Sequence, residues 1–223
     1  TKPWAGLIGS HAWATDAMPQ LAAALEVQAV FAAHDYEPQA MSRDHTVETA
    51  LRKNGIALFT YKDHVIFERR EVLTQVGNPY GVFTPYMRAW LAKLGDVPPA
   101  QHDCQQHAQA LADRPSAYAE GVPSLESLGF QGTNLKSLGI TPGTSGASQL
   151  VDDFWERMDR YEETRNFPSV KGPSYLSVHL RFGTVSIRQL VGLALQRKME
   201  GSAGASVWLG ELVWRDFYFQ VLA

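Results

Sequence analysis

The chain has 223 residues, of which 45% are hydrophobic and 19% charged, which is typical of a soluble globular protein with one large or two small domains. The formal net charge of -3 argues against a uniformly basic nucleic-acid binder. A single cysteine, Cys104, excludes an internal disulfide framework and is typical of a reducing compartment. Because the sequence holds no apolar run of membrane-spanning length and no secretory leader, we expect a cytoplasmic protein without a membrane partner.

The first part of the chain alternates between predicted strands and predicted helices. Short apolar runs predict strands at Leu7–Ile8, Gln28–Ala33 and Ile56–Tyr61. Amphipathic stretches predict the intervening helices at Asp16–Val27 and Pro38–Lys53. Strands that are joined through helices pair in parallel with right-handed crossovers. We therefore expect an α/β domain built on a parallel sheet.

A long connection separates this part from a helical one. A helix is predicted from Thr84, as its N-cap, to Leu94. Residues 95–145 then hold five of the twelve prolines and only short apolar clusters, which predicts a surface connection and a domain boundary. The sequence thus predicts an α/β domain at 1–94, an interdomain connection at 95–145 and a helical domain at 146–223.

Three helices are predicted in the last part of the chain. Ala147–Thr164 has one continuous helical pattern, and Ser186-Ile187-Arg188-Gln189 is a capping box that opens a helix through Lys198. Ser206–Leu222 is an apolar, aromatic helical run without a stop residue after it. Because the chain begins and ends within or close to predicted elements, we expect an internal piece of a longer protein.

Neither a nucleotide fingerprint nor a metal motif is present. Gly6 and Gly9 do not form the glycine pattern of a dinucleotide site, and there is no P-loop. His102, Cys104 and His107 lie close together around Asp103, but no second ligand pair follows at a zinc-site spacing. A polar connection is therefore the favoured interpretation, and no metal site is expected.

The strongest compositional feature is a basic run. From Thr164 to Met199 there is no Asp or Glu, whereas six residues are basic. Such a run favours phosphate ligands, with a solvated basic surface as the alternative. Within it, Gly172–Ser177 is a loop of small residues that either holds a phosphate through amides and hydroxyls or begins a serine-capped helix. The six basic residues are Arg165, Lys171, Arg181, Arg188, Arg197 and Lys198.

The last predicted helix carries a face of mixed chemistry. At about 100° per residue, five side chains fall within an arc of roughly 120°. They combine two indoles and a phenol with one carboxylate and one guanidinium. Such a face suits a flat, polar, aromatic ligand such as a base or an isoalloxazine ring, with a domain interface as the alternative. These residues are Trp208, Glu211, Trp214, Arg215 and Tyr218.

Five stretches in order resemble the DNA photolyase/cryptochrome family over nearly the whole chain. Each is a weak indication alone, but the five together in the family's order and spacing are specific. The resemblance is greatest to bacterial class I cyclobutane pyrimidine dimer photolyases, and it implies an incomplete Rossmann-like α/β antenna domain followed by the start of an all-α FAD-binding domain. The stretches are His34–Pro38 with Arg43-Asp44, Val82–Tyr86 with Ala89-Trp90, Tyr161–Pro168, Lys171–Gly183 and Trp208–Tyr218.

The resemblance implies site residues position by position. In dimer photolyases the catalytic pair at Glu211 and Trp214 hydrogen-bonds to the dimer and stacks on it, and signalling cryptochromes commonly lack the pair. Pro173 stands where the flavin loop often begins with Thr, so one N–H donor is lost there. The implied flavin contacts are Tyr161, Pro173, Ser174, Tyr175, Leu176, Ser177, Trp208 and Arg215, and the implied DNA contacts are Arg165, Glu211, Trp214, Arg215 and Tyr218.

The function implied by the resemblance is light-driven repair of cyclobutane pyrimidine dimers in DNA by electron transfer from reduced FAD. The dimer would leave the duplex to reach the flavin. The tryptophan electron-transfer chain and the rest of the flavin pocket would lie outside this chain, so the piece alone is expected to be inactive. The alternatives are a cryptochrome-type blue-light photoreceptor without repair activity and an inactive fragment that binds no flavin.

The resemblance also bears on the antenna and the partners. Gln39-Ala40 stands where folate-antenna photolyases have Asn-Glu, so a folate antenna is not expected, whereas a deazaflavin-type antenna or none is compatible. The implied partner is damaged DNA that contains a pyrimidine dimer. We expect the longer protein to be a monomer in the bacterial cytoplasm, associated with the nucleoid through DNA.

Overall fold

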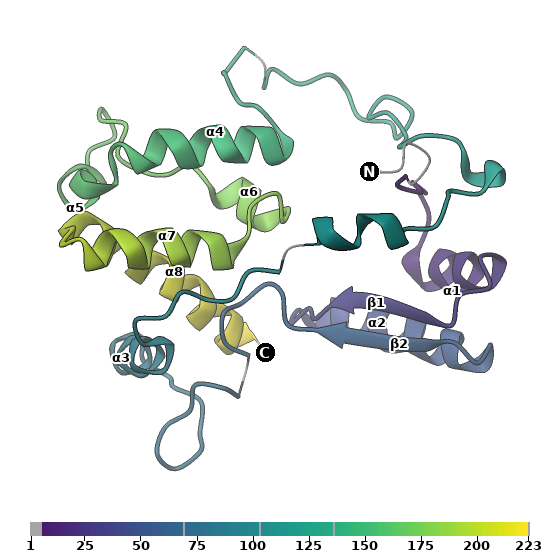
Figure 1. Cartoon of the computed structure of the whole chain (residues 1–223), viewed down its shortest axis with the longest axis horizontal. Coiled ribbons are helices and arrows are strands. Elements are labelled where there is room, and N and C mark those ends of the chain that lie inside the picture. The colour runs from purple at the N-terminus through teal and green to yellow at the C-terminus, as the bar shows by residue number, and fades with distance from the viewer. Residues whose placement is uncertain (1–5, 69, 103, 136, 223) are drawn as a thin grey trace. The chain divides into compact units, whose positions relative to one another are not determined.

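The computed structural model describes residues 6–68, 70–102, 104–135 and 137–222 (Figure 1). Asp103, in the histidine–cysteine cluster, lies outside these residues. The chain forms two compact units. We call them the sheet unit, which takes in residues up to Ala32, Gln39–Phe59 and His102–Leu138, and the helical unit, which takes in Ala33–Pro38, Thr60–Gln101 and the residues from Gly139 on.

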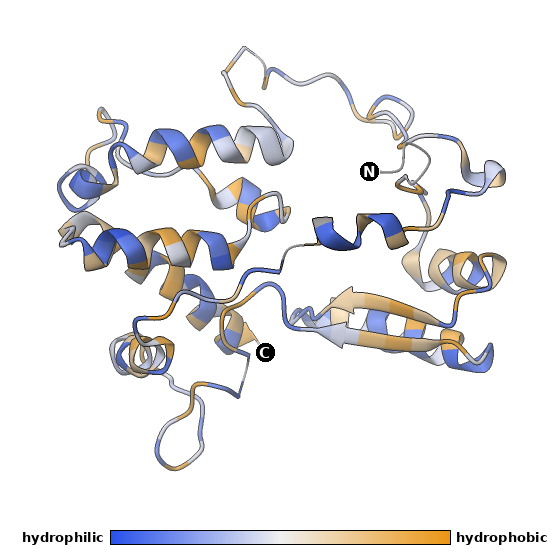
Figure 2. Ribbon diagram, in the orientation of Figure 1, coloured by the Kyte–Doolittle hydropathy of each residue, from blue (hydrophilic) through white to orange (hydrophobic). Residues whose placement is uncertain are grey.

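The sheet unit is built around two parallel strands. Its elements are α1 (Ala14–Ala24), β1 (Ala29–Ala33), α2 (Pro38–Lys53) and β2 (Ala57–Tyr61). Both strands are apolar along nearly their whole length (Figure 2). Inward-facing strand residues pack on a small core of Ala22, Val47, Leu51 and Ile56, which comes largely from the two helices. The predicted α/β class with a parallel sheet is confirmed.

The predicted strand at Leu7–Ile8 is wrong. The carbonyl of Leu7 accepts a hydrogen bond from Arg114 Nη1 at 3.2 Å, so it is not part of a ladder. A Cβ added at Gly9 would lie 3.0 Å from Pro123 Cδ and 3.1 Å from Val122 Cα. This segment therefore packs on another loop of the sheet unit, and no neighbouring strand among the described residues supplies the backbone partners that a strand needs.

The helical unit is organised around its last helix. α8 (Ala203–Leu222) contacts α3 (Phe83–Leu94), α5 (Tyr161–Thr164) and α7 (Ile187–Met199), and α7 lies beside it (Figure 1). The other elements are α4 (Gly143–Trp155), the short 3-10 turn η3 (Met158–Arg160) and α6 (Ser177–Arg181). The fully buried side chains of Trp90, Phe154, Leu190, Val191 and Val213 form its core.

The two predicted N-caps of this unit have different outcomes. α3 begins at Phe83 with Val82 as its N-cap, so Thr84 lies inside the first turn and its predicted capping role is wrong. Ser186 is the N-cap of α7 as predicted, but its side chain makes no cap hydrogen bond, so the predicted capping box does not form. In both helices, tertiary packing decides where the helix begins without help from a side-chain cap.

The continuous helix predicted at Ala147–Thr164 is also wrong. α4 ends at Trp155, and the chain passes through η3 before α5 begins. The interrupted backbone packs on a residue far along the sequence, Gly204 in the first turn of α8. A Cβ at that glycine would collide with the carbonyl oxygens of Met158 and Asp159. The break in the helix brings this backbone directly against α8, where only a glycine leaves room for it.

Among the described residues, no helix has both the length and the apolar composition required to cross a membrane.

Candidate functional site

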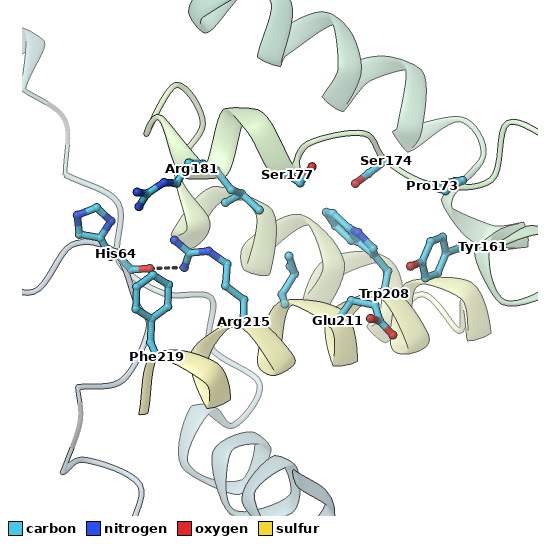
Figure 3. Close-up of a pocket in the computed structure, with 12 residues that line it drawn as sticks. His64, Tyr161, Pro173, Ser174, Ser177, Arg181, Trp208, Glu211, Arg215 and Phe219 are labelled. Atoms are coloured by element: carbon cyan, nitrogen blue, oxygen red, sulfur yellow. Dashed lines mark hydrogen bonds between the residues drawn. The ribbon is translucent and has the colours of Figure 1, made fainter. Parts of the chain in front are cut away.

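A cavity of about 370 Å³ lies in the helical unit, between α8, α6, α5 and the loop before α6 (Figure 3). α8 supplies one wall from residues spaced three or four apart, which a helix places on one side. The cavity combines aromatic surface with hydroxyls and two guanidinium groups. Its lining residues are His64, Tyr161, Pro173, Ser174, Ser177, Leu180, Arg181, Trp208, Glu211, Leu212, Arg215 and Phe219.

The aromatic wall is rigid because it is part of the core. Trp208 is 4% exposed and Tyr161 is 8% exposed, and both pack on Phe154 with ring centroids 4.8 and 5.7 Å away. Burial raises the pKa of Tyr161 above its ordinary value, although the Arg165 charge opposes this rise. The phenol is therefore a neutral hydrogen-bonding group at this wall.

An ion pair closes one end of the site. Arg165 Nη1 donates to Glu211 Oε1 at 2.6 Å, and the guanidinium of Arg165 lies over the ring of Tyr161 at 5.3 Å. Burial lowers the pKa of Arg165, but the hydrogen bond to Glu211 and the electrostatic interactions with Tyr161 and Glu211 together outweigh it, so the pKa lies above its ordinary value. Both side chains are about one third exposed, so the pair is accessible to an incoming charged group.

At the other end, Arg215 is a half-buried cation without a carboxylate partner. Its Nη1 donates to the backbone carbonyl of His64, and its guanidinium lies over the ring of Phe219 at 4.6 Å (Figure 3). Burial lowers the pKa of Arg215, and the nearby Asp216 charge opposes this shift. Among the described residues, no carboxylate lies within ion-pair distance of this group. An anion in the cavity would compensate its charge.

The neighbouring Asp216 points into the protein and fixes the segment that contacts Arg215. Its Oδ2 accepts hydrogen bonds from the amides of Ile66 and Phe67, at 3.1 and 3.2 Å, and from Trp90 Nε1 at 2.9 Å. Burial raises its pKa to about 6, although the three hydrogen bonds and Arg215 oppose this rise. Adjacent residues of α8 thus hold neighbouring positions of one segment, His64 and Ile66-Phe67.

The loop before α6 contributes only part of the predicted flavin set to the cavity. Pro173, Ser174 and Ser177 line it. Leu176 is 1% exposed and belongs to the core, whereas Tyr175 is 50% exposed and has a left-handed backbone with φ of 58°. Neither of these two side chains lines the cavity.

Four of the five predicted DNA contacts form two pairs, and the fifth, Arg215, lines the cavity. Arg165 and Glu211 bind each other at the cavity, as described above. Trp214 does not line the cavity. Its indole stacks on Phe83 of α3, with ring centroids 3.5 Å apart and an angle of 8°, and on the exposed Tyr218 at 5.4 Å. The prediction that Trp208 and Trp214 share one ligand-binding face of the helix is therefore wrong for the cavity, because Trp208 lines it whereas Trp214 packs on α3.

The basic run does not form a free positive surface. Most of its members are paired with acids from other parts of the sequence, so their charge is largely compensated. This packing weakens the interpretation of the whole run as one anion site. Of the two arginines that line the cavity, Arg215, outside the run, is the one without an acid partner among the described residues. The pairs are Arg165–Glu211, Lys171–Asp153, Arg181–Glu37, Arg188–Asp63 and Arg197 with Asp159 and Glu200.

Three of the residues at or beside the site that were not predicted from the sequence show what a sequence pattern can and cannot reveal. His64 acts through its backbone carbonyl, which has no sequence signature. Phe219 follows Arg215 by four residues, and this spacing on a helix is the pattern that could have identified it. Phe83, which covers Trp214, lies on a different helix, and only the fold brings it there.

The chain was compared with known proteins. A family model described as DNA photolyase matches residues 6–105. A deoxyribodipyrimidine photo-lyase of Halobacterium salinarum is 34% identical and covers 97% of this chain, which spans 45% of that protein. An uncharacterized 31.6 kDa protein of Synechococcus sp. strain PCC 6716 is 34% identical, and the chain covers 70% of it. The crystal structure of a class III photolyase from Agrobacterium tumefaciens matches with a TM-score of 0.79 at 26% identity, over 94% of this chain and 43% of that one.

These matches extend over both units, and the chain spans less than half the length of the photolyases that it matches. Their agreement with the five sequence stretches and with the two observed units leads to one conclusion: the chain belongs to the DNA photolyase family.

Proposed function

We propose that the whole protein to which this chain belongs repairs cyclobutane pyrimidine dimers in DNA, using light and electron transfer from reduced FAD. The observation that carries this proposal is the cavity along α8, where Trp208, Arg215 and Glu211 face one space (Figure 3). The photolyases among its relatives support the same reaction class.

The residues present fit part of an FAD site. A flat ring system would pack against Trp208 and Tyr161. A diphosphate would bind the uncompensated charge of Arg215 and the hydroxyls of Ser174 and Ser177. When bound, reduced FAD supplies the photoexcited electron that splits the dimer. The side chains of this chain bind and orient the cofactor and exclude water from one side of it.

Glu211 and Arg165 form the substrate end of the proposed site. In the present structure Arg165 Nη1 donates a hydrogen bond to Glu211 Oε1 at 2.6 Å, so the two charges compensate each other. A DNA phosphate would compete with the Glu211 carboxylate for the Arg165 guanidinium, because both are anions of suitable geometry. A carboxylate released in this way could accept a hydrogen bond from a base of the flipped dimer. The proposed partner is therefore damaged DNA, bound by a monomeric protein.

The antenna proposal follows from α2. Ala40 is 7% exposed, so it offers neither a carboxylate nor accessible surface to a pterin. We propose a deazaflavin-type antenna or none in the whole protein, and no folate.

A cryptochrome-type photoreceptor is the second candidate. The observation that favours it is the stacking of Trp214 on Phe83, because an indole that is already covered on one face offers less surface to a flipped base. In that function, the same cavity would hold flavin without a repair reaction.

The test is Trp214→Ala in the whole protein, with the 79% exposed Trp13 replaced by Ala as a matched control. We expect unchanged FAD content and binding to dimer-containing DNA that is weaker by about 1–3 kcal/mol, roughly 5- to 150-fold. Binding to undamaged DNA and its salt dependence should not change, because no phosphate contact is removed. Light-dependent loss of dimers is measured in parallel. Flavin loss with retained preference for damaged DNA would refute the assignment, and flavin binding without any repair would favour the photoreceptor.

A further inference from the structure

Arg157 lies outside the cavity, yet its side chain contacts the loop that forms one of the cavity's walls. Its Nη1 donates to the carbonyls of Lys171 and Gly172, the latter at 3.0 Å, and its Nη2 donates to the carbonyl of Pro173 at 3.0 Å. One guanidinium therefore holds three consecutive backbone carbonyls. This is a use for which the planar fork of arginine, with its five donors, is suited and lysine is not.

The guanidinium is itself held in place. Asp153, one turn earlier on α4, accepts from Arg157 Nη2 at 2.8 Å and from Nε at 3.1 Å. The other oxygen of Asp153 accepts from Lys171 Nζ at 2.7 Å. The carboxylate therefore binds both Arg157 and the side chain of the first loop residue whose carbonyl Arg157 holds. Hydrogen bonds from Lys171 and then Arg157 lower the pKa of Asp153 below its ordinary value. Arg157 also lies over the ring of Phe154, at 5.3 Å.

The far side of the loop is equally restricted. A Cβ added at Gly172 would lie 2.6 Å from the carbonyl oxygen of Thr164 and 3.0 Å from the amide of Arg165. The loop is thus confined between the Arg157 side chain and the backbone that carries Arg165. Three residues after Gly172, Tyr175 adopts a φ of 58°, a left-handed conformation that is unfavourable for a tyrosine.

We propose that Arg157 is a positioning residue for the cavity: by holding the carbonyls of residues 171–173, it directs the Ser174 amide and the serine side chains of the loop toward the ligand. In a planar trans peptide the carbonyl and the following N–H point in opposite directions. The Pro173 carbonyl is held by Arg157, so the Ser174 N–H points away from Arg157, on the side where Ser174 lines the cavity. The same hydrogen bonds also help to hold Tyr175 in its left-handed backbone conformation. This inference rests on the proposed function only for the identity of the ligand that Ser174 and Ser177 bind.

The test replaces Arg157 by Lys in the chain described here, which keeps the positive charge but not the fork. Arg160→Lys is the matched control, because Arg160 is 74% exposed and its side chain pairs only with Glu163 among the described contacts. The readout is the NMR order parameter of the backbone amides of Ser174 and Tyr175. We expect it to fall from about 0.85 to below about 0.6 in Arg157→Lys, with no change in α7 and α8 and none in the control. A role in general stability would lower the melting temperature without this local change.

A second measurement needs no variant. In the unmodified chain, a guanidinium held by three carbonyls should show separate, slowly exchanging Nη protons for Arg157. A single averaged signal, or unchanged order parameters in Arg157→Lys, overturns the proposal. Inorganic pyrophosphate then serves as a probe of the ligand. The chemical-shift changes of the Ser174 and Ser177 amides should require an at least tenfold higher pyrophosphate concentration to saturate in Arg157→Lys. Loss of loop order without any pyrophosphate binding in the unmodified chain would support the role of Arg157 and count against a phosphate site.

Discussion

The sheet unit and the helical unit bury very different amounts of apolar surface. Among the described residues, the core of the sheet unit contains four buried apolar side chains, whereas the core of the helical unit contains twenty. Hydrophobic stabilisation is roughly proportional to the buried apolar area. The cavity and the residues that position it therefore lie in the unit with the larger stability, and local opening should begin in the sheet unit.

The largest expected effect comes from removing a core side chain of the smaller unit. Leu51 is fully buried, so Leu51→Ala should cost about 2–5 kcal/mol. This loss should remove the hydrogen-exchange protection of α1, α2 and the strands while α7 and α8 keep theirs. Leu190→Ala, at an equally buried position of the helical unit, is the control and should affect α7 and α8. If either variant reduced hydrogen-exchange protection equally in both units, the two units would unfold as one cooperative unit, and the expected difference in their stability would be contradicted.

A second effect belongs to the helical unit alone and depends on pH. Burial raises the pKa of Asp216 from 3.8 to about 6, so the folded state binds an extra proton between these values. The free energy of unfolding should then fall by about 3 kcal/mol as the pH rises through this window, and level off above it. Asp216→Asn should remove this component, as measured by urea unfolding at a series of pH values.

Trp90→Phe sharpens the same measurement. The indole hydrogen bond lowers the pKa of Asp216, so its removal should move the upper end of the window to higher pH. Identical pH profiles for Asp216→Asn and the unmodified chain would contradict the assignment of this titration to Asp216.

The smallest effect returns to the sheet unit. Gly55 has a φ of 71° just after α2, and an added Cβ would meet nothing within 4 Å. Gly55→Ala should therefore cost about 1 kcal/mol through backbone strain alone, and only protection in the sheet unit should decrease. Gly81→Ala is the control, because Gly81 has equal space and no left-handed backbone. Its stability should be unchanged or slightly higher.

Elements with local determinants were predicted well. The helix at Pro38–Lys53 has both bounds as predicted, and its C-terminal bound has a local cause, because Gly55 just after it adopts a left-handed backbone with φ of 71°. The interruption of the helix predicted at Ala147–Thr164 could not be predicted, since the interrupted backbone packs on Gly204, which lies on another helix. Secondary structure was thus predictable where its cause lay within a few residues.

The same distinction applies to the candidate site. The spacing of Trp208, Glu211 and Arg215 on one helix identified the cavity wall. Arg157 was not singled out, because its importance depends on three carbonyls that lie 14 to 16 residues later in the sequence. The roles assigned to Glu211 and Trp214 in repair stay predictions.

The contact between α8 and the segment around residues 64–67 also has a direction. Arg215 donates to the carbonyl of His64, and Asp216 accepts from the amides of Ile66 and Phe67. A segment laid in the opposite sense would present donors to the guanidinium and acceptors to the carboxylate. Adjacent opposite charges therefore encode the N-to-C polarity of the chain that they bind, and exchanging the two residues would make both contacts repulsive.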